Sequence, residues 1–343
     1  MMNRRVDYGR IALILTVVIL GIFAVDFIRR LWIDWHGMQG SLTINSSQVD
    51  SISDPVLVPD QTDTTGGSQT TTGSNGSDAE TTTTASAAIP SDYSVLQIAS
   101  STATSGSTIL VNDSHLYKGT PELRAFSDFT YAHLRLPVTS LQIESMTVDP
   151  LVSMFNDFYA ATGFGDIMIY STTNEPSSVQ YGTGIAERTT GLSIDLAVLN
   201  EAAGYHTPYT GETYSWIAEH AHEYGYVLRF PEGKEDITGQ PAMSWHYRYV
   251  GIPHAAYMQA NNLCLEEYLD LLAKEHTWSD EHLTVTVGGT SYEIYYVEAK
   301  SGGNVTEIPY PNGCDPQISG DNMNGFVVAC AMNGAAEPAG TEE

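Results

Sequence analysis

Apolar and polar residues are distributed very differently in the N-terminal and C-terminal parts of this 343-residue chain. Residues 11–28 form an apolar run in which Asp26 is the single charged residue. A run of about 18 residues is near the lower limit for a helix that crosses a membrane. Basic residues flank both ends, so the charge distribution favours a cytoplasmic N-terminus only weakly. We expect a transmembrane signal anchor at 11–28 and a cytoplasmic tail at 1–10.

The alternative for this segment is a cleaved signal peptide, which also has a basic region followed by an apolar one. No small-x-small cleavage site follows the run, because the chain continues Arg29-Arg30-Leu31-Trp32. Both interpretations place the remainder of the chain on the extracytoplasmic side of a membrane.

A segment rich in Ser and Thr follows the apolar run. Between residues 62 and 86, 14 of 25 positions are Ser or Thr. Such a composition buries too little apolar surface to offset the entropy lost when the chain is ordered. We therefore expect a flexible linker at 29–92, and a frayed acidic tail at 334–343.

From residue 93 onward the apolar positions follow strand-like and helix-like spacing in turn. Apolar runs bounded by turn residues predict strands at 108–112, 166–170, 191–197, 226–230 and 245–250. Helical spacing predicts helices at 213–224, 253–261 and 264–275. A further helix is expected to begin with Asp149 as N-cap and Pro150 in its first turn, and to end before Gly163. Strands and helices mixed without strict alternation indicate the α+β class.

The C-terminal stretch has the pattern of β-hairpins. Residues 283–287 and 291–297 flank a Gly-Gly turn, and a second turn-rich stretch surrounds Gly320. We expect a small β accessory unit at 281–333, following a main domain at 93–280.

Three cysteines are too few for a disulfide scaffold. Cys314 and Cys330 lie on either side of the second predicted turn, so they could face each other and pair, or remain reduced. Cys264 is then left over and is expected to be a small buried apolar residue.

The charge balance narrows the classes of partner. The chain has 41 acidic and 14 basic residues, which gives a net charge of −27. Binding to nucleic acid needs a surplus of Lys and Arg, so this composition argues against it. Hydrophobic residues make up 42% of the chain, which is enough to build a core and excludes wholesale disorder.

Two blocks of the sequence resemble one protein family. The block from Trp216 to Gly239 and the segment Trp245-His-Tyr-Arg-Tyr-Val-Gly251 are similar to the signature of VanY-type D-Ala-D-Ala carboxypeptidases, which are LAS-type zinc metallopeptidases. The stretch from Glu187 to Asp195 resembles the upstream metal motif of that family, Ser-x-His-x-x-Gly-x-x-x-Asp. The resemblance covers about residues 107–330. It implies mixed helices around a small antiparallel sheet, and a place in the bacterial cell membrane with the globular part outside the cytoplasm.

The family hydrolyses the D-Ala-D-Ala bond of peptidoglycan stem peptides with one zinc ion and a general-base Glu. The zinc is held by a His, an Asp seven residues later and a distant His. In this sequence Asp195 and His246 keep two of these positions, whereas Arg188 occupies the third. Met243 stands at the position of the general base. An arginine has no lone pair for a metal, and a thioether is not a useful base.

The resemblance also implies positions that contact substrate. An Arg of the family corresponds to Asn174 here, and Ser193, Trp245 and Arg248 are the other expected substrate-binding residues. Changes at three chemical roles lead to the hypothesis that Arg188 replaces the metal and pairs with Asp195.

The leading prediction is a membrane-anchored pseudoenzyme that needs no cofactor and binds peptidoglycan stem peptides or envelope proteins. One alternative is an active zinc-dependent DD-carboxypeptidase with replacement ligands such as His220 or His222, of which at most one could point inward from a helix. Another is a structural envelope protein in which the groove has closed and only the surface matters. Separately, His246 could be a buried, locally hydrogen-bonded residue of a strand, and Asp195 a structural salt-bridge partner.

Overall fold

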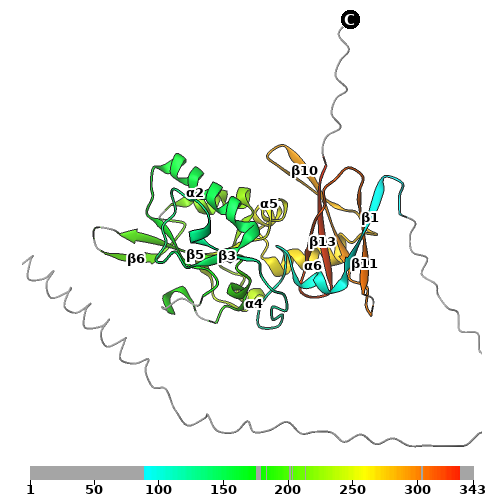
Figure 1. Ribbon diagram of the computed structural model, residues 1–343, viewed down its shortest axis with the longest axis horizontal. Helices are drawn as coiled ribbons and strands as arrows, with labels where there is room; N and C mark the ends of the chain where they lie inside the picture. Colours follow the sequence, from blue (N-terminus) through cyan, green and yellow to red (C-terminus); the bar gives the residue numbers. More distant parts are fainter. Residues whose placement is uncertain are drawn as a thin grey trace, which may run out of the picture. The chain divides into compact units, whose positions relative to one another are not determined.

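The computed structural model of the chain describes residues 89–332, except 175–178, 183, 201, 203, 213 and 303 (Figure 1). The described residues belong to one compact unit of the chain. The predicted anchor, the tail at 334–343 and all but the last four residues of the predicted linker lie outside them. Within the described part, no helix is both long enough and apolar enough to span a bilayer.

A five-stranded antiparallel sheet forms the centre of the main domain. Its strands follow the order β4-β5-β8-β7, and β6 pairs with the far end of β5. They are β4 (Ile167–Ser171), β5 (Ser193–Asn200), β6 (Tyr205–Pro208), β7 (Tyr226–Phe230) and β8 (Met243–Tyr249). Ile194 pairs with Tyr247 across β5 and β8, and Asp195 pairs with His246. Because successive strand residues point to opposite faces, these two pairs lie on opposite sides of the sheet.

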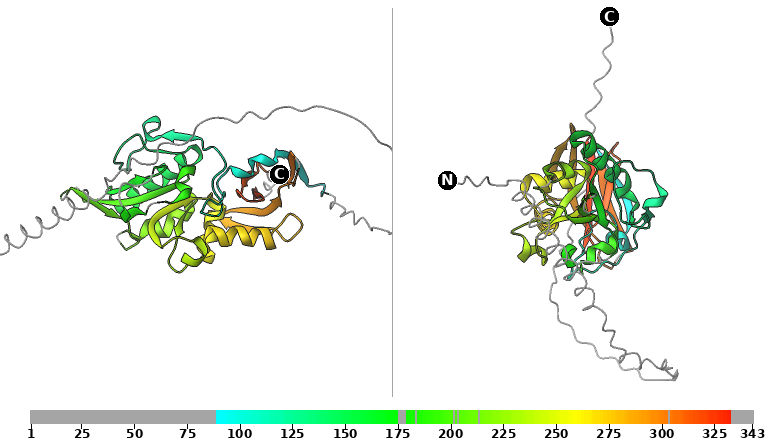
Figure 2. Two further views of the ribbon diagram at one scale, coloured as in Figure 1. Left: turned by 90° about the horizontal axis from the view of Figure 1, so that it is seen from below. Right: turned by 90° about the vertical axis from the view of Figure 1, so that its left-hand side faces the viewer.

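Helices surround this sheet (Figures 1 and 2). They are α2 (Val148–Thr162), α3 (Ser215–His220), α4 (Glu235–Thr238), α5 (Ile252–Asn261) and α6 (Leu265–Glu275). Short 3-10 turns link them to the strands: η1 (Ser100–Thr104), η2 (Phe126–Asp128), η3 (Ser145–Thr147), η4 (Val179–Tyr181), η5 (Ala186–Thr190) and η6 (Ala221–Tyr224). Apolar residues of α2 pack in one buried cluster with Ile194 and Tyr247, so that face of the sheet is the core face.

The predicted α+β class is confirmed. For α2, the predicted end of the helix is also confirmed, whereas the predicted N-cap residue is wrong. The helix ends at Gly163, whose φ of 74° is the left-handed conformation expected of a glycine after a helix. It does not begin with Asp149 as N-cap, because the turn η3 runs directly into it and Thr147 takes the N-cap position. Asp149 lies instead in the first turn, where a carboxylate suits the positive end of the helix dipole.

The C-terminal part is a second antiparallel sheet with the strand order β12-β13-β10-β9. Its strands are β9 (Leu283–Val287), β10 (Thr290–Glu298), β12 (Gln317–Gly320) and β13 (Gly325–Met332). Both predicted hairpins are therefore present. Two further pairs are β1 (Tyr93–Ala99) with β11 (Val305–Pro311), and β2 (Leu123–Ala125) with β3 (Gln142–Glu144). Thus residues 93–99, which the sequence places in the main domain, pair with a C-terminal strand (Figure 1).

The strand predicted at 108–112 is wrong, although its apolar residues are buried. Ile109, Leu110 and Val111 are buried, but they are not paired with any strand of the described residues. The backbone of this segment is hydrogen-bonded to a loop and to side chains: Leu110 N donates to the carbonyl of Asp321, and Asn322 donates to the carbonyl of Leu110. Side chains thus satisfy a buried backbone that the sequence pattern assigns to a sheet.

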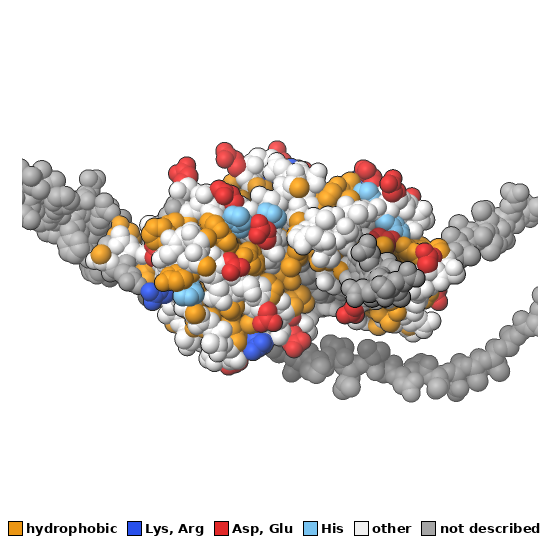
Figure 3. All heavy atoms as spheres, turned by 90° about the horizontal axis from the view of Figure 1, so that it is seen from above, with side chains coloured by type: hydrophobic (Ala, Val, Ile, Leu, Met, Phe, Trp, Pro, Cys, Tyr) orange, Lys and Arg blue, Asp and Glu red, His pale blue; other side chains and the backbone are white. Residues whose placement is uncertain are grey.

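The sequence leaves open whether Cys314 and Cys330 pair or remain reduced, and the structure decides between the two. Cys314 and Cys330 form a disulfide, with their Cα atoms 5.8 Å apart. Cys264 is free and buried, as expected. The surface in Figure 3 carries scattered acidic side chains and few Lys or Arg, in keeping with the strongly negative composition.

Candidate functional site

Asp195 and His246 face each other from the neighbouring strands β5 and β8. They are cross-strand partners, and His246 Nδ1 lies 2.6 Å from Asp195 Oδ1. Both side chains are buried. The sheet therefore brings together the two residues that occupy metal-ligand positions in the resemblance, and it joins them by a direct hydrogen bond.

Arg188 lies on the other side of the Asp195 carboxylate. It comes from η5, and its Nε donates to Asp195 Oδ2 over 3.0 Å while a terminal nitrogen lies 2.9 Å from the same oxygen. The same terminal nitrogen, Nη2, donates to the backbone carbonyl of Tyr181 at 2.9 Å, and Nη1 donates to that of Gly182 at 3.2 Å. The ion pair that the hypothesis requires is therefore present.

Glu187, which the sequence analysis does not single out, completes the cluster. Its Oε1 lies 2.8 Å from His246 Nε2, and its Oε2 accepts from Arg229 Nε over 2.7 Å. Arg229 also donates to both carboxylate oxygens of Glu266. A signal was present in the sequence, because Arg229 is the one charged residue of the apolar run 226–230, and a buried charge needs a partner.

The electrostatic environment fixes the charge states in this cluster. Burial alone would raise the pKa of Glu187, but Arg229, the hydrogen bond with His246 and Arg248 outweigh it and hold that pKa well below its usual range. Burial alone would lower the pKa of His246, but the neighbouring carboxylates of Asp195 and Glu187 outweigh it and raise that pKa. Both ring nitrogens of His246 face carboxylate oxygens, so the imidazole donates from both and carries a positive charge.

These side chains do not fit a catalytic zinc ion. Such an ion needs three protein ligands that each offer a lone pair. Both nitrogens of His246 are engaged as donors, Asp195 accepts from His246 and Arg188, and a guanidinium has no lone pair. Among the described residues, no cluster of three or more His, Cys, Asp or Glu side chains has the geometry to hold a metal ion.

Met243, at the position of the general base, belongs to an apolar cluster. It is buried with Ile185 and Phe230, and Trp245 packs against them. The Cε atom of Met243 lies 3.1 Å from the point where a Cβ on Gly182 would stand, so the methionine fills the space beside that glycine. A thioether in this setting packs and does not take up a proton.

The expected substrate-binding residues have different surroundings. Asn174 is exposed, and its backbone carbonyl accepts a hydrogen bond from Ser171. Ser193 Oγ and the indole nitrogen of Trp245 are buried atoms that have no hydrogen-bond partner within the described part of the chain. Tyr181 packs edge-on against Trp245, with ring centroids 6.2 Å apart, and its hydroxyl is unpartnered among the same residues.

Arg248 is placed differently from the expectation that it binds substrate. It is fully buried, and its guanidinium donates to the carbonyls of Ser107 and Ile109, both at 3.0 Å. Burial lowers its pKa to about 10, despite the nearby Glu187. Nη2 of Arg248 thus holds the buried segment around residue 109, while its Nε donates to the carbonyl of Tyr249 and its Nη1 lies 3.5 Å from Glu187 Oε2.

The suggested replacement ligands make other contacts. His220 Nδ1 lies 2.9 Å from Glu223 on the helix surface. His222 lines a separate cavity with Leu228 and Met258. Neither contact involves Asp195 or His246.

Comparisons with known proteins agree with this geometry at the level of family and fold. Residues 164–252 match the family model for VanY, D-alanyl-D-alanine carboxypeptidase. Over 189 residues the chain is 33% identical to a D-alanyl-D-alanine carboxypeptidase of Enterococcus faecium, and this match covers 54% of the chain and 58% of that protein. It is 51% identical over 51 residues to the bifunctional D-Ala-D-Ala dipeptidase and carboxypeptidase VanXYC of Enterococcus gallinarum, covering 15% of the chain and 27% of that protein.

A solved structure extends the likeness. The vancomycin-resistance D,D-dipeptidase VanXYg, in complex with a D-Ala-D-Ala phosphinate analogue, superposes with a TM-score of 0.56 at 25% identity. The superposition covers 70% of this chain and 99% of that one. The chain spans just over half the length of the Enterococcus faecium relative that it matches. We conclude that residues 164–252 are similar to the VanY D-alanyl-D-alanine carboxypeptidase family, and that the chain has the mixed helices and antiparallel sheet of that fold.

Proposed function

Starting from this similarity, we propose that the chain is a VanY-type homologue that binds D-Ala-D-Ala-terminated stem peptides, or an envelope protein, without cleaving them. The observation that carries this proposal is the position of Arg188, whose guanidinium binds the one carboxylate that the zinc site of the family would need. We further propose that residues 11–28 anchor the chain in the bacterial cell membrane and that the domain acts outside the cytoplasm.

A count of charges supports the replacement of the metal. In a site of the family type, the zinc ion contributes two positive charges and the Asp contributes one negative charge. Here the guanidinium of Arg188 and the doubly protonated ring of His246 contribute two positive charges, and Asp195 again contributes one negative charge. The two positive charges beside Asp195 therefore keep its buried carboxylate compensated without a metal.

The residues at the catalytic positions support the absence of hydrolysis. Attack of water on an amide needs a group that takes the proton from the water and a positive centre that polarises the carbonyl. Met243 supplies no base, and the hydrogen bonds of Arg188 are engaged by Asp195 and by backbone carbonyls. Neither part of the chemistry is therefore provided by these side chains.

Retained peptide binding has a different basis. The structural neighbour VanXYg was solved with a D-Ala-D-Ala phosphinate analogue. In this chain Ser193, Trp245 and Tyr181 keep buried polar atoms that are unpartnered within the described residues. A polar ligand that reached them would satisfy atoms that now carry a desolvation cost.

The test uses the full chain, purified with zinc present and then dialysed. Its zinc content is measured, and it is incubated with a pentapeptide that ends in D-Ala-D-Ala while free D-Ala and bound peptide are followed. We expect no stoichiometric zinc, no released D-Ala, and saturable binding that a pentapeptide ending in L-Ala-L-Ala does not reproduce. About one zinc per chain with release of D-Ala would overturn the proposal in favour of an active carboxypeptidase. Neither binding nor cleavage would favour a structural envelope protein.

The proposed location has its own test. In intact cells that lack an outer barrier, an added protease should cleave the folded part, and the chain should sediment with the membrane fraction. A variant with Leu15→Arg and Val18→Glu in the apolar run should lose this membrane association. Sedimentation of that variant with the membrane at the level of the wild type would contradict the anchor.

A further inference from the structure

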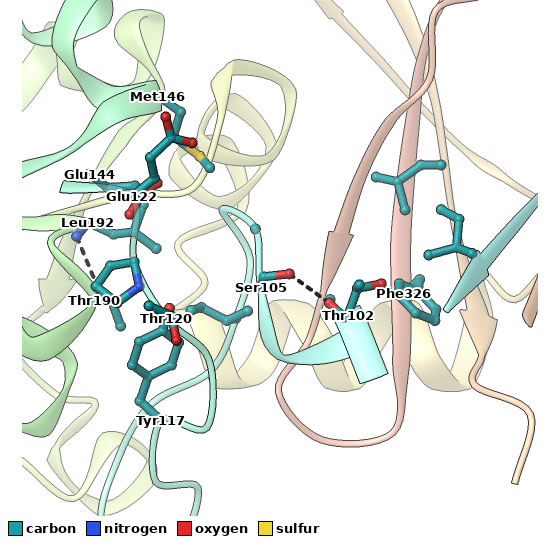
Figure 4. Close-up of a pocket in the computed structure, with 16 residues that line it drawn as sticks. Thr102, Ser105, Tyr117, Thr120, Glu122, Glu144, Met146, Thr190, Leu192 and Phe326 are labelled. Carbon is teal, nitrogen blue, oxygen red and sulfur yellow. Dashed lines mark hydrogen bonds between the residues drawn. The ribbon is translucent and has the colours of Figure 1, made fainter. Parts of the chain in front are cut away.

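A cavity of about 320 Å³ lies beside the end of η5, where Thr190 and Leu192 contribute to its lining (Figure 4). Its walls come from the β2–β3 region on one side and from η1 and the end of β12 on the other. The described residues that line it do not include Asp195, His246 or Met243. It is therefore distinct from the site that the family comparison identifies, and binding in it would be independent of the proposed function.

The fold places two carboxylates side by side in this cavity. Leu123 pairs with Glu144 across β2 and β3, which brings Glu122, the residue before Leu123, next to Glu144. Ser145 N donates to the carbonyl of Glu122 over 2.7 Å, and Glu144 N donates to the carbonyl of Gly191 over 2.9 Å. Figure 4 shows Glu122, Glu144 and Met146 together on one side, facing Thr102 and Ser105. These backbone hydrogen bonds fix the positions of the two residues, with the Glu144 side chain buried and the Glu122 side chain exposed at the rim of the cavity.

The opposite wall is equally well fixed. Gly320 N donates to the carbonyl of Ser105 over 2.8 Å. A Cβ on Gly320 would stand 2.0 Å from the carbonyl oxygen of Ala103, so only glycine allows this approach. Gly106 has a φ of 115°, which other residues rarely adopt, and a Cβ there would collide with Ser319. The cavity is thus a preformed feature between two rigid walls, as ligand sites commonly are.

The charge of the cavity is uncompensated. The side chain of Glu144 is 8% exposed. Burial, together with the negative charge of Glu122, raises the pKa of Glu144 to about 7. The described residues that line the cavity include no Lys, Arg or His. A buried carboxylate without a cationic partner is costly, and a bound cation would remove that cost.

The rest of the lining selects the kind of cation. Side chains of Ile109, Leu192 and Phe326 supply apolar surface, and the hydroxyls of Tyr117 and Thr120 supply polar contacts. A divalent metal ion would need more oxygen ligands than two carboxylates offer and would gain nothing from the apolar wall. A volume of about 320 Å³ is at the lower end of the range for ligand pockets, which fits a molecule of amino-acid size.

We propose that this cavity is a second binding site of the chain, for a small organic cation that places a primary ammonium group between Glu122 and Glu144. The hydrocarbon part of the ligand lies along Ile109, Leu192 and Phe326. The side chain of a lysine-like residue has this chemistry.

The test is calorimetric titration of the full chain with Nα-acetyl-L-lysine amide, and with the uncharged analogue Nα-acetyl-L-norleucine amide. We expect the lysine derivative to bind and the norleucine derivative to bind at least about tenfold more weakly, since the ammonium contacts are charge-assisted. Glu144→Gln should weaken binding of the lysine derivative by about tenfold or more. Glu219→Gln, which neutralises an exposed acid that does not line the cavity, should leave the affinity unchanged.

A second variant keeps the proposal testable if Glu144→Gln alters the fold. Thr120 lies exposed at the edge of the cavity, so Thr120→Trp should block entry with little effect on the melting temperature. It should abolish binding of the lysine derivative. Equal binding of the two derivatives, or binding that survives both substitutions, would overturn the proposal, as would no binding at millimolar ligand. Because none of these measurements involves a D-Ala-D-Ala peptide, failure here is separate from failure of the proposed function.

Discussion

Nε of Arg188 lies 3.0 Å from Oδ2 of Asp195, and both side chains are 1% exposed. The family pattern has a metal-binding imidazole at the position of Arg188. The guanidinium therefore does by charge and hydrogen bonding what a metal ion would do by coordination. The stability of the fold should therefore depend on this pair. Replacing Arg188 by the histidine of the family should also be a requirement for a variant that binds a metal ion.

Removal of the guanidinium should destabilise the fold. Arg188→Met leaves the Asp195 carboxylate buried beside a thioether, and breaking a buried pair in this way costs about 3–5 kcal/mol. The free energy of unfolding should fall by that amount in urea denaturation at neutral pH.

Lys274→Met provides the matched control, since Lys274 and Asp270 form an exposed pair one helical turn apart at 2.8 Å. Its loss should change the free energy of unfolding by less than about 0.5 kcal/mol. An Arg188→Met protein as stable as the Lys274→Met protein would contradict the structural role given to the buried pair.

Restoring the family residues should restore a metal site. In Arg188→His combined with Met243→Glu, three ligand positions and a base are again present, and Glu187 already accepts a hydrogen bond from Nε2 of His246. A carboxylate behind a histidine is the usual outer partner of a zinc ligand. We expect about one zinc ion per chain after dialysis, measured by elemental analysis, against none in the wild type.

The control for this gain is the triple variant in which Asp195→Asn is added to the two substitutions. It should bind no zinc. Zinc bound by the single variant Met243→Glu, or zinc that persists in the triple variant, would mean that other residues bind it. Release of D-Ala from a pentapeptide is a second and more demanding readout, because the substrate contacts must also be in place.

Local patterns predicted the elements whose partners are near in sequence. The strand predicted at 226–230 is β7 with the same bounds, because apolar runs closed by Gly225 and Pro231 are a local signal. The strand β1 carries no such signal, since Tyr93 pairs with Pro311 in a strand more than 200 residues away. The segment at 108–112 shows the opposite case: its apolar residues are buried, but its backbone is not paired with a strand.

The candidate site was predictable in part for a similar reason. The family resemblance placed Arg188 and Asp195 at two metal-ligand positions of one motif, and this allowed their ion pair to be predicted. The roles of Glu187 and Arg229 depend on η5 and β7 meeting in space, which sequence spacing does not encode. The resemblance implied a substrate contact for Arg248, and nothing in the sequence indicated that its side chain extends toward the backbone at Ser107.

Loss of the disulfide should destabilise the C-terminal sheet. Cys314 and Cys330 are 16 residues apart, and closing a loop of this length contributes about 3 kcal/mol in the chain-entropy model. The double substitution of both cysteines by Ser should lower the melting temperature, and a reducing agent should lower that of the wild type alone. A reducing agent that affects the variant equally would point to a different origin of the effect.

His254 should make the folded protein sensitive to mild acid. It is buried in α5 with its Nδ1 2.7 Å from the hydroxyl of Tyr268, and burial lowers its pKa to about 4. Above pH 6.5, its ordinary pKa, neither the folded nor the unfolded state binds the proton. As the pH falls below that value, the unfolded state takes up the proton first, so stability is lost, by about 2 kcal/mol between pH 7 and pH 5.

His254→Gln keeps a neutral hydrogen-bonding side chain and should remove this share of the pH dependence. The measurement is urea denaturation of both proteins at pH 7 and pH 5. Between these two pH values the free energy of unfolding should fall by about 2 kcal/mol more in the wild type than in the variant. If the free energy of unfolding depended on pH identically in both proteins, the pKa of His254 would be the same in the folded and unfolded states, which would contradict this prediction.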